Sequence, residues 1–204
     1  MATLSLTQFL TLDGVYQAPG GPEEDPSGGF DRGGWVAPYV DEDFGGFIDE
    51  VFARPAAFLL GRRTYDIFAS YWPRQTDPGD PVASKLNALP KYVVSTTLAS
   101  ADWPTTTVLR GDAADAVAAL KERVDGEIQM HGSGGLAQTL LAHDLIDRLH
   151  LLVFPVVLGA GRRLFREGAT PSAFRLTDAR STSVGVAIHT YERAGRPEFG
   201  TIGE

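Results

Sequence analysis

The sequence predicts an α/β fold with a largely parallel sheet and antiparallel strands at its C-terminal edge. Segments with the apolar patterns of strands and of amphipathic helices alternate along the first two thirds of the chain, which is typical of parallel strands joined by helices. Residues 174–177 and 184–192 are then predicted strands without an intervening helix, which favours antiparallel pairing. The length predicts one domain over residues 1–193 and a loose tail over residues 194–204.

The composition excludes several kinds of partner and site. The formal net charge is −8 and no run of Lys or Arg forms a basic face, so nucleic-acid binding is not expected. Without cysteine the chain can form no disulfide or zinc–thiolate site, and its four histidines lack metal-ligand spacing, so no metal is expected. The chain starts without a basic flank or an unbroken apolar core, so a cytoplasmic protein that does not bind membranes is expected.

The first predicted strand, Thr3–Phe9, leads to a turn and then to a long loop. Asp13 lies in the turn Leu-Asp-Gly and is therefore expected at the C-terminal end of the strand. Residues 17–34 hold six glycines and three prolines, so neither a helix nor a strand is expected there. A loop of this length is usually a functional lid or disordered, and the sequence leaves both interpretations open.

An amphipathic helix is predicted over Asp41–Ala53. Its apolar stripe indicates packing on the core, and its first turn is acidic, with carboxylates that include Asp41 and Asp43.

The next strand-to-helix turn contains the clearest local positive charge. Ala56–Leu60 is a predicted buried strand, and Gly61, Arg62, Arg63 and Thr64 open the helix that follows. Two adjacent arginines can hold a phosphate through bidentate hydrogen bonds, while the hydroxyl and the helix N-terminus add donors. Solvated surface arginines are the alternative interpretation.

The middle of the chain continues the alternation. After a short helix through Asn87, Lys91–Ser95 is a predicted strand, and its terminal hydroxyl at Ser95 is placed to contact a phosphate. A brief strand around Val108 and an alanine-rich helix over Ala113–Val124 follow.

A glycine-rich turn follows the predicted strand Ile128–Met130 and opens another amphipathic helix. Gly132, Gly134 and Gly135 allow an anion such as a diphosphate to approach the backbone N–H groups at the helix N-terminus. The alternative is a turn that needs glycine only for its dihedral angles. Ser133 lacks the Gly-x-Ser-x-Gly frame of a hydrolase.

A long apolar strand is predicted over Leu149–Leu158. Together with the late edge strands, it makes a homodimer the expected assembly.

Five segments in register carry a resemblance to a known family. They are residues 12–14 (Leu-Asp-Gly), 61–65 (Gly-Arg-Arg-Thr-Tyr), 93–95 (Val-Val-Ser), 132–135 (Gly-Ser-Gly-Gly), and 155–161 (Pro-Val-Val-Leu-Gly-Ala-Gly) followed by Leu164-Phe165. Together they resemble the dihydrofolate reductase-like superfamily, in particular the C-terminal reductase domain of bifunctional riboflavin-biosynthesis proteins. The resemblance extends from Leu4 to Glu192.

The resemblance implies a three-layer dihydrofolate reductase-like fold that binds NADPH for hydride transfer to a small pterin- or aminopyrimidine-like substrate. Asp13 matches an aspartate of the riboflavin reductases, and Asp41 or Asp43 follows Trp35 in a way similar to the substrate carboxylate of dihydrofolate reductase. The implied cofactor residues are Gly61, Arg62, Arg63 and Thr64 at the phosphates, Ser95 near the adenosine, and Gly132, Ser133, Gly134, Gly135 and Leu136 at the diphosphate.

Two other functions remain open. One is a nucleotide-binding module without turnover. The other is a Rossmann-type NAD oxidoreductase, since residues 132–137 fit the pattern G-x-G-x-x-[GA], although apolar residues 152–155 occupy the place of the expected ribose-binding acid. The riboflavin enzymes usually carry a glutamate where this chain has Ser133, so the substrate is left open.

Overall fold

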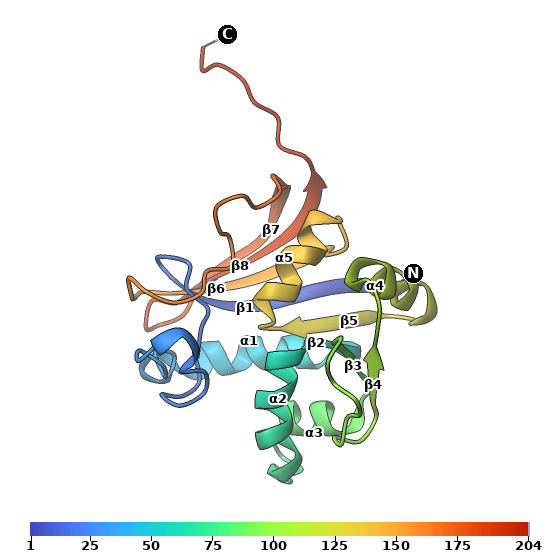
Figure 1. Cartoon of the computed structure of the whole chain (residues 1–204). Coiled ribbons are helices and arrows are strands. Elements are labelled where there is room, and N and C mark those ends of the chain that lie inside the picture. Colours follow the sequence, from blue (N-terminus) through green and yellow to red (C-terminus); the bar gives the residue numbers. More distant parts are fainter. Residues whose placement is uncertain (204) are drawn as a thin grey trace.

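The structure, a computed structural model, describes residues 1–203 and contains one eight-stranded sheet (Figure 1). In chain order the strands are β1 (Thr3–Thr11), β2 (Pro55–Gly61), β3 (Lys91–Val94), β4 (Thr106–Leu109), β5 (Glu127–His131), β6 (Arg148–Phe154), β7 (Ala173–Ser181) and β8 (Ala187–Gly195). They lie in the order β4-β3-β2-β5-β1-β6-β8-β7. Neighbours from β4 to β6 run parallel, whereas β8 runs antiparallel to both β6 and β7.

The predicted fold class is confirmed, because the sheet is mixed, mainly parallel, and ends in antiparallel C-terminal strands. This order differs from the 3-2-1-4-5-6 order of a Rossmann domain, so the Rossmann alternative is wrong for the fold.

Helices cover both faces of the sheet and complete three layers. They are α1 (Glu42–Phe52), α2 (Arg62–Tyr71), α3 (Pro81–Ala88), α4 (Ala113–Arg123) and α5 (Gly134–Ala142), with 3-10 turns η1 (Ser27–Gly29), η2 (Ala37–Tyr39) and η3 (Trp72–Arg74). Residues of α4 and α5 share a buried cluster with Leu4 and Leu6 of β1, and residues of α1 and α3 share another with Phe154. Figure 1 shows α5 on the near side of the sheet.

The acids that begin several helices act as caps. The Asp41 carboxylate accepts a hydrogen bond from Phe44 N, and Asp80 and Asp112 do the same at the starts of α3 and α4. Such caps satisfy backbone donors that the helix itself leaves unpaired.

Several predicted boundaries differ from the structure at the C-terminal side, and β7 is longer than the predicted strand of residues 174–177. β6 ends at Phe154 rather than Leu158, because Pro155 has no N–H to continue a strand ladder. β8 begins at Ala187 rather than Val184, since residues 182–185 form a turn. It then continues to Gly195, beyond the predicted start of the tail.

Residues 17–34 form a packed loop rather than a disordered segment. Gly34 N donates to Ala18 O over 2.8 Å, and the Trp35 indole N–H donates to Gln17 O over 2.8 Å, so the two ends of the loop lie together. Phe30 inserts a buried ring under the loop. Among residues 1–203, no helix combines the length and apolar content that crossing a membrane requires.

Candidate functional site

A cavity of about 1060 Å³ opens at the edge of the sheet where the parallel strands end. Its walls come from β1, from the ends of β2 and β5, and from the segments that follow β2 and β5. Residues 16–25 of the loop and side chains of α2 also line it. Ligands of open α/β sheets bind at this edge, so the cavity is the candidate functional site.

Two strand-to-helix turns meet at the cavity and are bonded to each other. Gly61 N donates to Ser133 Oγ over 3.0 Å, and Ser133 N donates to Thr64 Oγ1 over 3.1 Å. The first turns of α2 and α5 therefore lie together and present their unpaired N–H groups at one place. The structure thus brings together two segments that the sequence singled out separately.

Arg62 and Arg63 both line the cavity but differ in their partners. Arg62 Nε lies 2.8 Å from both carboxylate oxygens of Asp66, one helical turn along α2. The Arg63 side chain is 58% exposed, and its Nε lies 3.8 Å from Asp25. Arg63 is therefore the more available of the two guanidinium groups for an anionic ligand.

The paired glycines at the start of α5 have different surroundings. A Cβ on Gly135 would meet nothing within 4 Å, whereas a Cβ on Gly134 would lie 2.4 Å from the ring of Tyr16. Gly132, with φ of +65°, and Ser133, with φ of +57°, carry the left-handed backbone of the turn. Gly132, Gly135 and their neighbour Leu136 all line the cavity. The turn thus needs glycine for its dihedral angles and also leaves open space at its surface.

Comparison with known proteins decides the family, since residues 2–190 match the family described as the RibD C-terminal domain. The chain belongs to the RibD C-terminal domain family. Over 188 residues it is 25% identical to an uncharacterized Bacillus subtilis protein, YyaP, covering 91% of this chain and 92% of that one.

Solved structures share the fold of this chain. A putative riboflavin biosynthesis protein from a Shewanella species has a TM-score of 0.67 and 22% identity, over 94% of this chain and 99% of that one. Dihydrofolate reductase from Enterococcus faecalis, complexed with NADP(H), has a TM-score of 0.59 and 13% identity, over 94% and 96%. A deaminase/reductase from Thermotoga maritima has a TM-score of 0.61 and 14% identity, and this chain spans 56% of its length. The predicted resemblance is confirmed.

Ser95 lies beside the cavity without lining it. Its neighbour Val94 is part of the wall. The buried Ser95 hydroxyl accepts hydrogen bonds from Thr97 N and Leu98 N, and so caps the turn after β3. The structure shows a turn-forming role for this hydroxyl, and contact with adenosine stays a prediction.

Asp13 is held by groups of the protein and does not line the cavity. Burial raises its pKa, but hydrogen bonds from the Thr11 hydroxyl, Leu158 N, Gly159 N and the Arg163 guanidinium outweigh that effect and lower the pKa well below its usual range. Asp13 therefore anchors the segment after β6 as a carboxylate.

Asp41 and Asp43 also lie outside the cavity wall. Both face the turn between β7 and β8: the Asp41 carboxylate accepts from the Ser183 hydroxyl over 2.8 Å, and the Asp43 carboxylate accepts from Ser183 N over 2.9 Å. The structure does not bring Asp13, Asp41 and Asp43 together, and the catalytic role of each stays a prediction.

The loop over the cavity is fixed by an ion pair. The Arg162 guanidinium donates to the Asp25 carboxylate and to the Ser27 hydroxyl, and Arg162 N donates to Gln17 Oε1 over 3.1 Å. Glu24 lines the cavity in this loop, and burial raises its pKa although two backbone N–H groups donate to it. The loop therefore supplies a carboxyl group that the sequence did not indicate.

The lining of the cavity includes aromatic side chains and two polar residues from β1 and β5. Phe9 of β1 and Phe68, Tyr71 and Trp72 from α2 and η3 line it, together with Thr7 and His131. These side chains were not placed in the site by the sequence analysis. The sequence pattern that could have indicated two of them is the alternation along β1, because it places Thr7 and Phe9 on the same face of the sheet.

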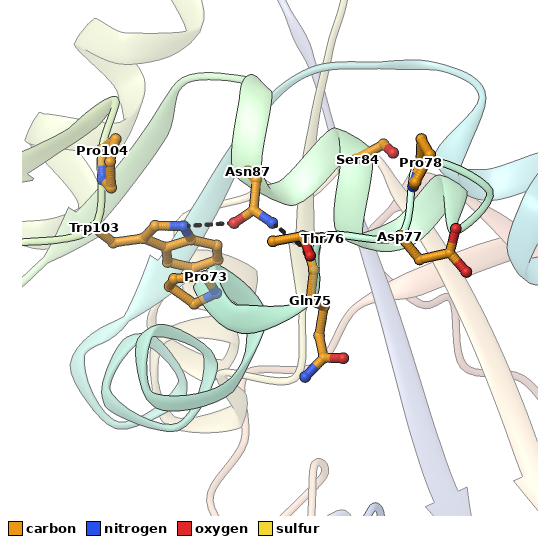
Figure 2. Close-up of a pocket in the computed structure, with 9 residues that line it drawn as sticks. All are labelled: Pro73, Gln75, Thr76, Asp77, Pro78, Ser84, Asn87, Trp103 and Pro104. Atoms are coloured by element: carbon orange, nitrogen blue, oxygen red, sulfur yellow. Dashed lines mark hydrogen bonds between the residues drawn. The ribbon is translucent and has the colours of Figure 1, made fainter.

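A second, smaller cavity of about 380 Å³ lies between η3, α3 and Trp103 (Figure 2). The Trp103 indole N–H donates to Asn87 Oδ1 over 3.0 Å, and Asn87 Nδ2 donates to Gln75 O over 3.2 Å. These polar groups satisfy one another, so we assign no ligand to this cavity.

Proposed function

We propose that this protein is an NADPH-dependent reductase that transfers a hydride to a small pterin- or aminopyrimidine-like substrate. The observation that carries the proposal is the pair of bonded turns, at residues 61–64 and 132–136, which gathers two helix N-termini and two arginines at one cavity. Its volume of about 1060 Å³ is at the upper end for ligand pockets, as a dinucleotide requires. NADPH is the general cofactor of the family.

The residues fit the phosphates of NADPH. Arg63 and Arg62 would hold the 2′-phosphate, because a guanidinium group matches phosphate oxygens bidentately. Thr64 and residues 132–136 would hold the diphosphate, since the side of the turn at Gly135 faces open space. Ser95 would border the adenosine from the turn after β3. The bound cofactor supplies the hydride, and the protein orients the two reactants.

Proton supply is the second requirement of a ring reduction. Glu24 lines the cavity and burial raises its pKa, which is the direction that suits a carboxyl group acting as a proton donor. Asp41 and Asp43 are the alternative proton donors that the family resemblance implies, whereas for Asp13 it implies contact with polar groups of the substrate. We propose Glu24 as better placed than Asp41 or Asp43, because neither of these lines the cavity.

The test is a titration of NADPH against NADH at fixed ionic strength, followed by a screen of pterins and aminopyrimidines for NADPH oxidation. The proposal predicts tighter binding of NADPH and oxidation that requires one of the rings. Equal affinity for both cofactors, or no binding of either, would contradict the proposal.

A nucleotide-binding module without turnover is the second candidate. The observation in its favour is that Asp13, Asp41 and Asp43 are all bonded within the protein and away from the cavity wall. This candidate predicts NADPH binding with no oxidation in the presence of any tested ring.

A further inference from the structure

The residues that line the cavity include one with a buried hydroxyl that has no partner within residues 1–203. Thr7 is 2% exposed, and its Oγ1 has no hydrogen-bond partner within residues 1–203. Buried hydroxyls are almost always paired in native proteins, so an unpaired one in a ligand cavity indicates a ligand group that pairs with it. Thr7 lines that cavity.

His131 lies directly beside Thr7. The two residues are register partners on the parallel strands β5 and β1, and their side chains therefore project from the same face of the sheet. The His131 ring stacks on Phe52 with 4.6 Å between centroids and 24° between planes, which fixes its orientation. His131 also lines the cavity.

The hydrogen-bond network assigns the proton on the His131 ring. Gln129 Nε2 donates to Val51 O over 2.8 Å and to Glu127 Oε1 over 3.2 Å, so the amide oxygen of Gln129 is the acceptor that faces His131. His131 Nε2 lies 3.2 Å from that oxygen and must carry the hydrogen. Burial and the nearby His150 lower the pKa of His131 to about 3, so the ring is neutral at physiological pH. Nδ1 is therefore a lone-pair acceptor, and the hydrogen bond of the ring to Gln129 leaves it available.

We propose that Thr7 and His131 form a subsite for an uncharged amide group. The Thr7 hydroxyl donates a hydrogen bond to the amide oxygen, and His131 Nδ1 accepts a hydrogen bond from the amide N–H. Phe9, Phe68 and Trp72 line the same cavity, and their aromatic surface favours a planar ring that carries the amide. A charged group is disfavoured because the two polar residues are themselves neutral.

This inference rests on the proposed function. If the cavity binds NADPH and a pterin- or aminopyrimidine-like substrate, each of the two ligands brings an amide group that fits the subsite. One is the carboxamide of the nicotinamide ring, and the other is a lactam in the ring of the substrate. The test must therefore separate the cofactor from the substrate.

The variants are Thr7→Val, which removes the hydroxyl at nearly constant shape, and His131→Phe, which keeps the stacking on Phe52. Thr7→Ser restores the hydroxyl and is the rescue control. Thermal unfolding of each variant shows whether it remains folded. The probes are NADPH, 2′-phospho-ADP-ribose, which lacks nicotinamide, and uracil or 1,3-dimethyluracil added to the NADP⁺ complex.

A cofactor amide predicts that Thr7→Val and His131→Phe each weaken NADPH binding about fivefold and leave 2′-phospho-ADP-ribose binding unchanged. A substrate lactam predicts unchanged NADPH binding and loss of uracil binding, with no binding of 1,3-dimethyluracil by the wild type. Thr7→Ser should bind like the wild type in either case.

The inference is overturned if folded variants bind NADPH and uracil as tightly as the wild type does, or if 2′-phospho-ADP-ribose binding falls equally. Failure of the proposed function looks different, because the wild type itself would then bind no NADPH. If the wild type then still binds uracil and the Thr7→Val and His131→Phe variants do not, the inference holds although the proposed function fails. If neither probe binds the wild type, both are overturned.

Discussion

Arg62 and Arg63 are adjacent in the chain, yet their surroundings give them different capacities to bind an anion. Arg62 is engaged by Asp66 along the helix, whereas Arg63 has only a distant contact with Asp25. An exposed ion pair contributes little to stability, and thus either arginine could exchange its partner for a phosphate at small cost. Arg63 gives up a weaker ion pair than Arg62 does, so we expect Arg63 to dominate recognition of the 2′-phosphate.

Arg63→Ala should weaken NADPH binding by about 10- to 100-fold and NADH binding much less, because a hydrogen bond to a charged group contributes about 1.5–3 kcal/mol. Arg62→Ala should have the smaller effect. Dissociation constants for both cofactors at fixed ionic strength measure this. Arg123→Ala, at an exposed arginine on α4 whose Nε donates to Ala119 O, is the matched control. Equal losses for NADPH and NADH would refute the assignment.

Gly134 and Gly135 provide a second contrast within one turn. Gly134→Val should lower the free energy of unfolding by about 1–3 kcal/mol, because its side chain would overlap the ring of Tyr16. Gly135→Ala should leave stability unchanged or raise it, since its position is open and helical. Urea denaturation measures both changes.

The Tyr16→Ala change should recover most of the stability lost in Gly134→Val, because it removes the overlapping ring. If the double variant is as unstable as Gly134→Val alone, the overlap is not the cause. NADPH binding by the recovered double variant then reports whether the glycine is also needed for the diphosphate.

At the scale of elements, the loop of residues 17–34 acts as one wall of the cavity. Arg162 is one of the residues that hold it to the body of the protein, because its guanidinium bonds Asp25 and Ser27. Glu23 is exposed in the loop and offers a cleavage site for a glutamyl endopeptidase.

Arg162→Ala should speed cleavage after Glu23 several-fold, because it removes the bonds that hold the loop closed. Arg166→Ala, an exposed arginine of the same segment, should leave the rate unchanged. NADPH should slow cleavage of the wild type if the loop closes over the cofactor. Mass spectrometry of the fragments measures the rates. Equal rates in all proteins would show that Arg162 does not hold the loop closed.

The sequence predicts most elements because their periodicity is local, but it predicts the site only in part. The alternation in β1 and the glycine turn before α5 are both visible in short windows of sequence. The contact of Tyr16 with Gly134, and the bond between Ser133 and Thr64, join segments far apart in the chain. No local pattern encodes such contacts, and for the same reason the sequence could not show that Asp13 is bonded away from the cavity.

For the whole molecule, buried histidines predict how stability depends on pH. Burial lowers the pKa of His150 to about 4, with smaller contributions from Arg54 and other charges, while an unfolded histidine titrates near 6.5. Between these values the unfolded state binds a proton that the folded state does not, so stability is lost as pH falls from about 6.5 to 4. His131, lowered to about 3, acts in the same direction.

His150→Gln should make the free energy of unfolding depend less steeply on pH between 6.5 and 4, by at most about 3 kcal/mol over that interval. Exposed His143→Gln should keep the steep dependence of the wild type. Urea denaturation at several pH values measures the slopes. Identical slopes for the wild type and His150→Gln would show that this histidine does not set the acid limit.

The homodimer expected from the sequence stays a prediction, and the sheet suggests where it forms. Leu176 of β7 is 49% exposed and is paired with Tyr191, which is paired with Leu149, so these residues share one face. A dimer would have twice the chain mass of 21.9 kDa, which light scattering can measure. Leu176→Glu should give monomers, and Val157→Glu, at another exposed apolar residue, should not. A wild-type monomer would contradict the prediction.

The position of β1 has a consequence for synthesis on the ribosome. β1 is made first, yet its two neighbours in the sheet are β5 and β6, which end at His131 and Phe154. During translation at about 5–20 residues per second, the first strand therefore waits several seconds with both edges unpaired. Unpaired strand edges invite association with other chains. A nascent chain stalled before β5 should consequently depend on chaperones, whereas one released after β6 should not.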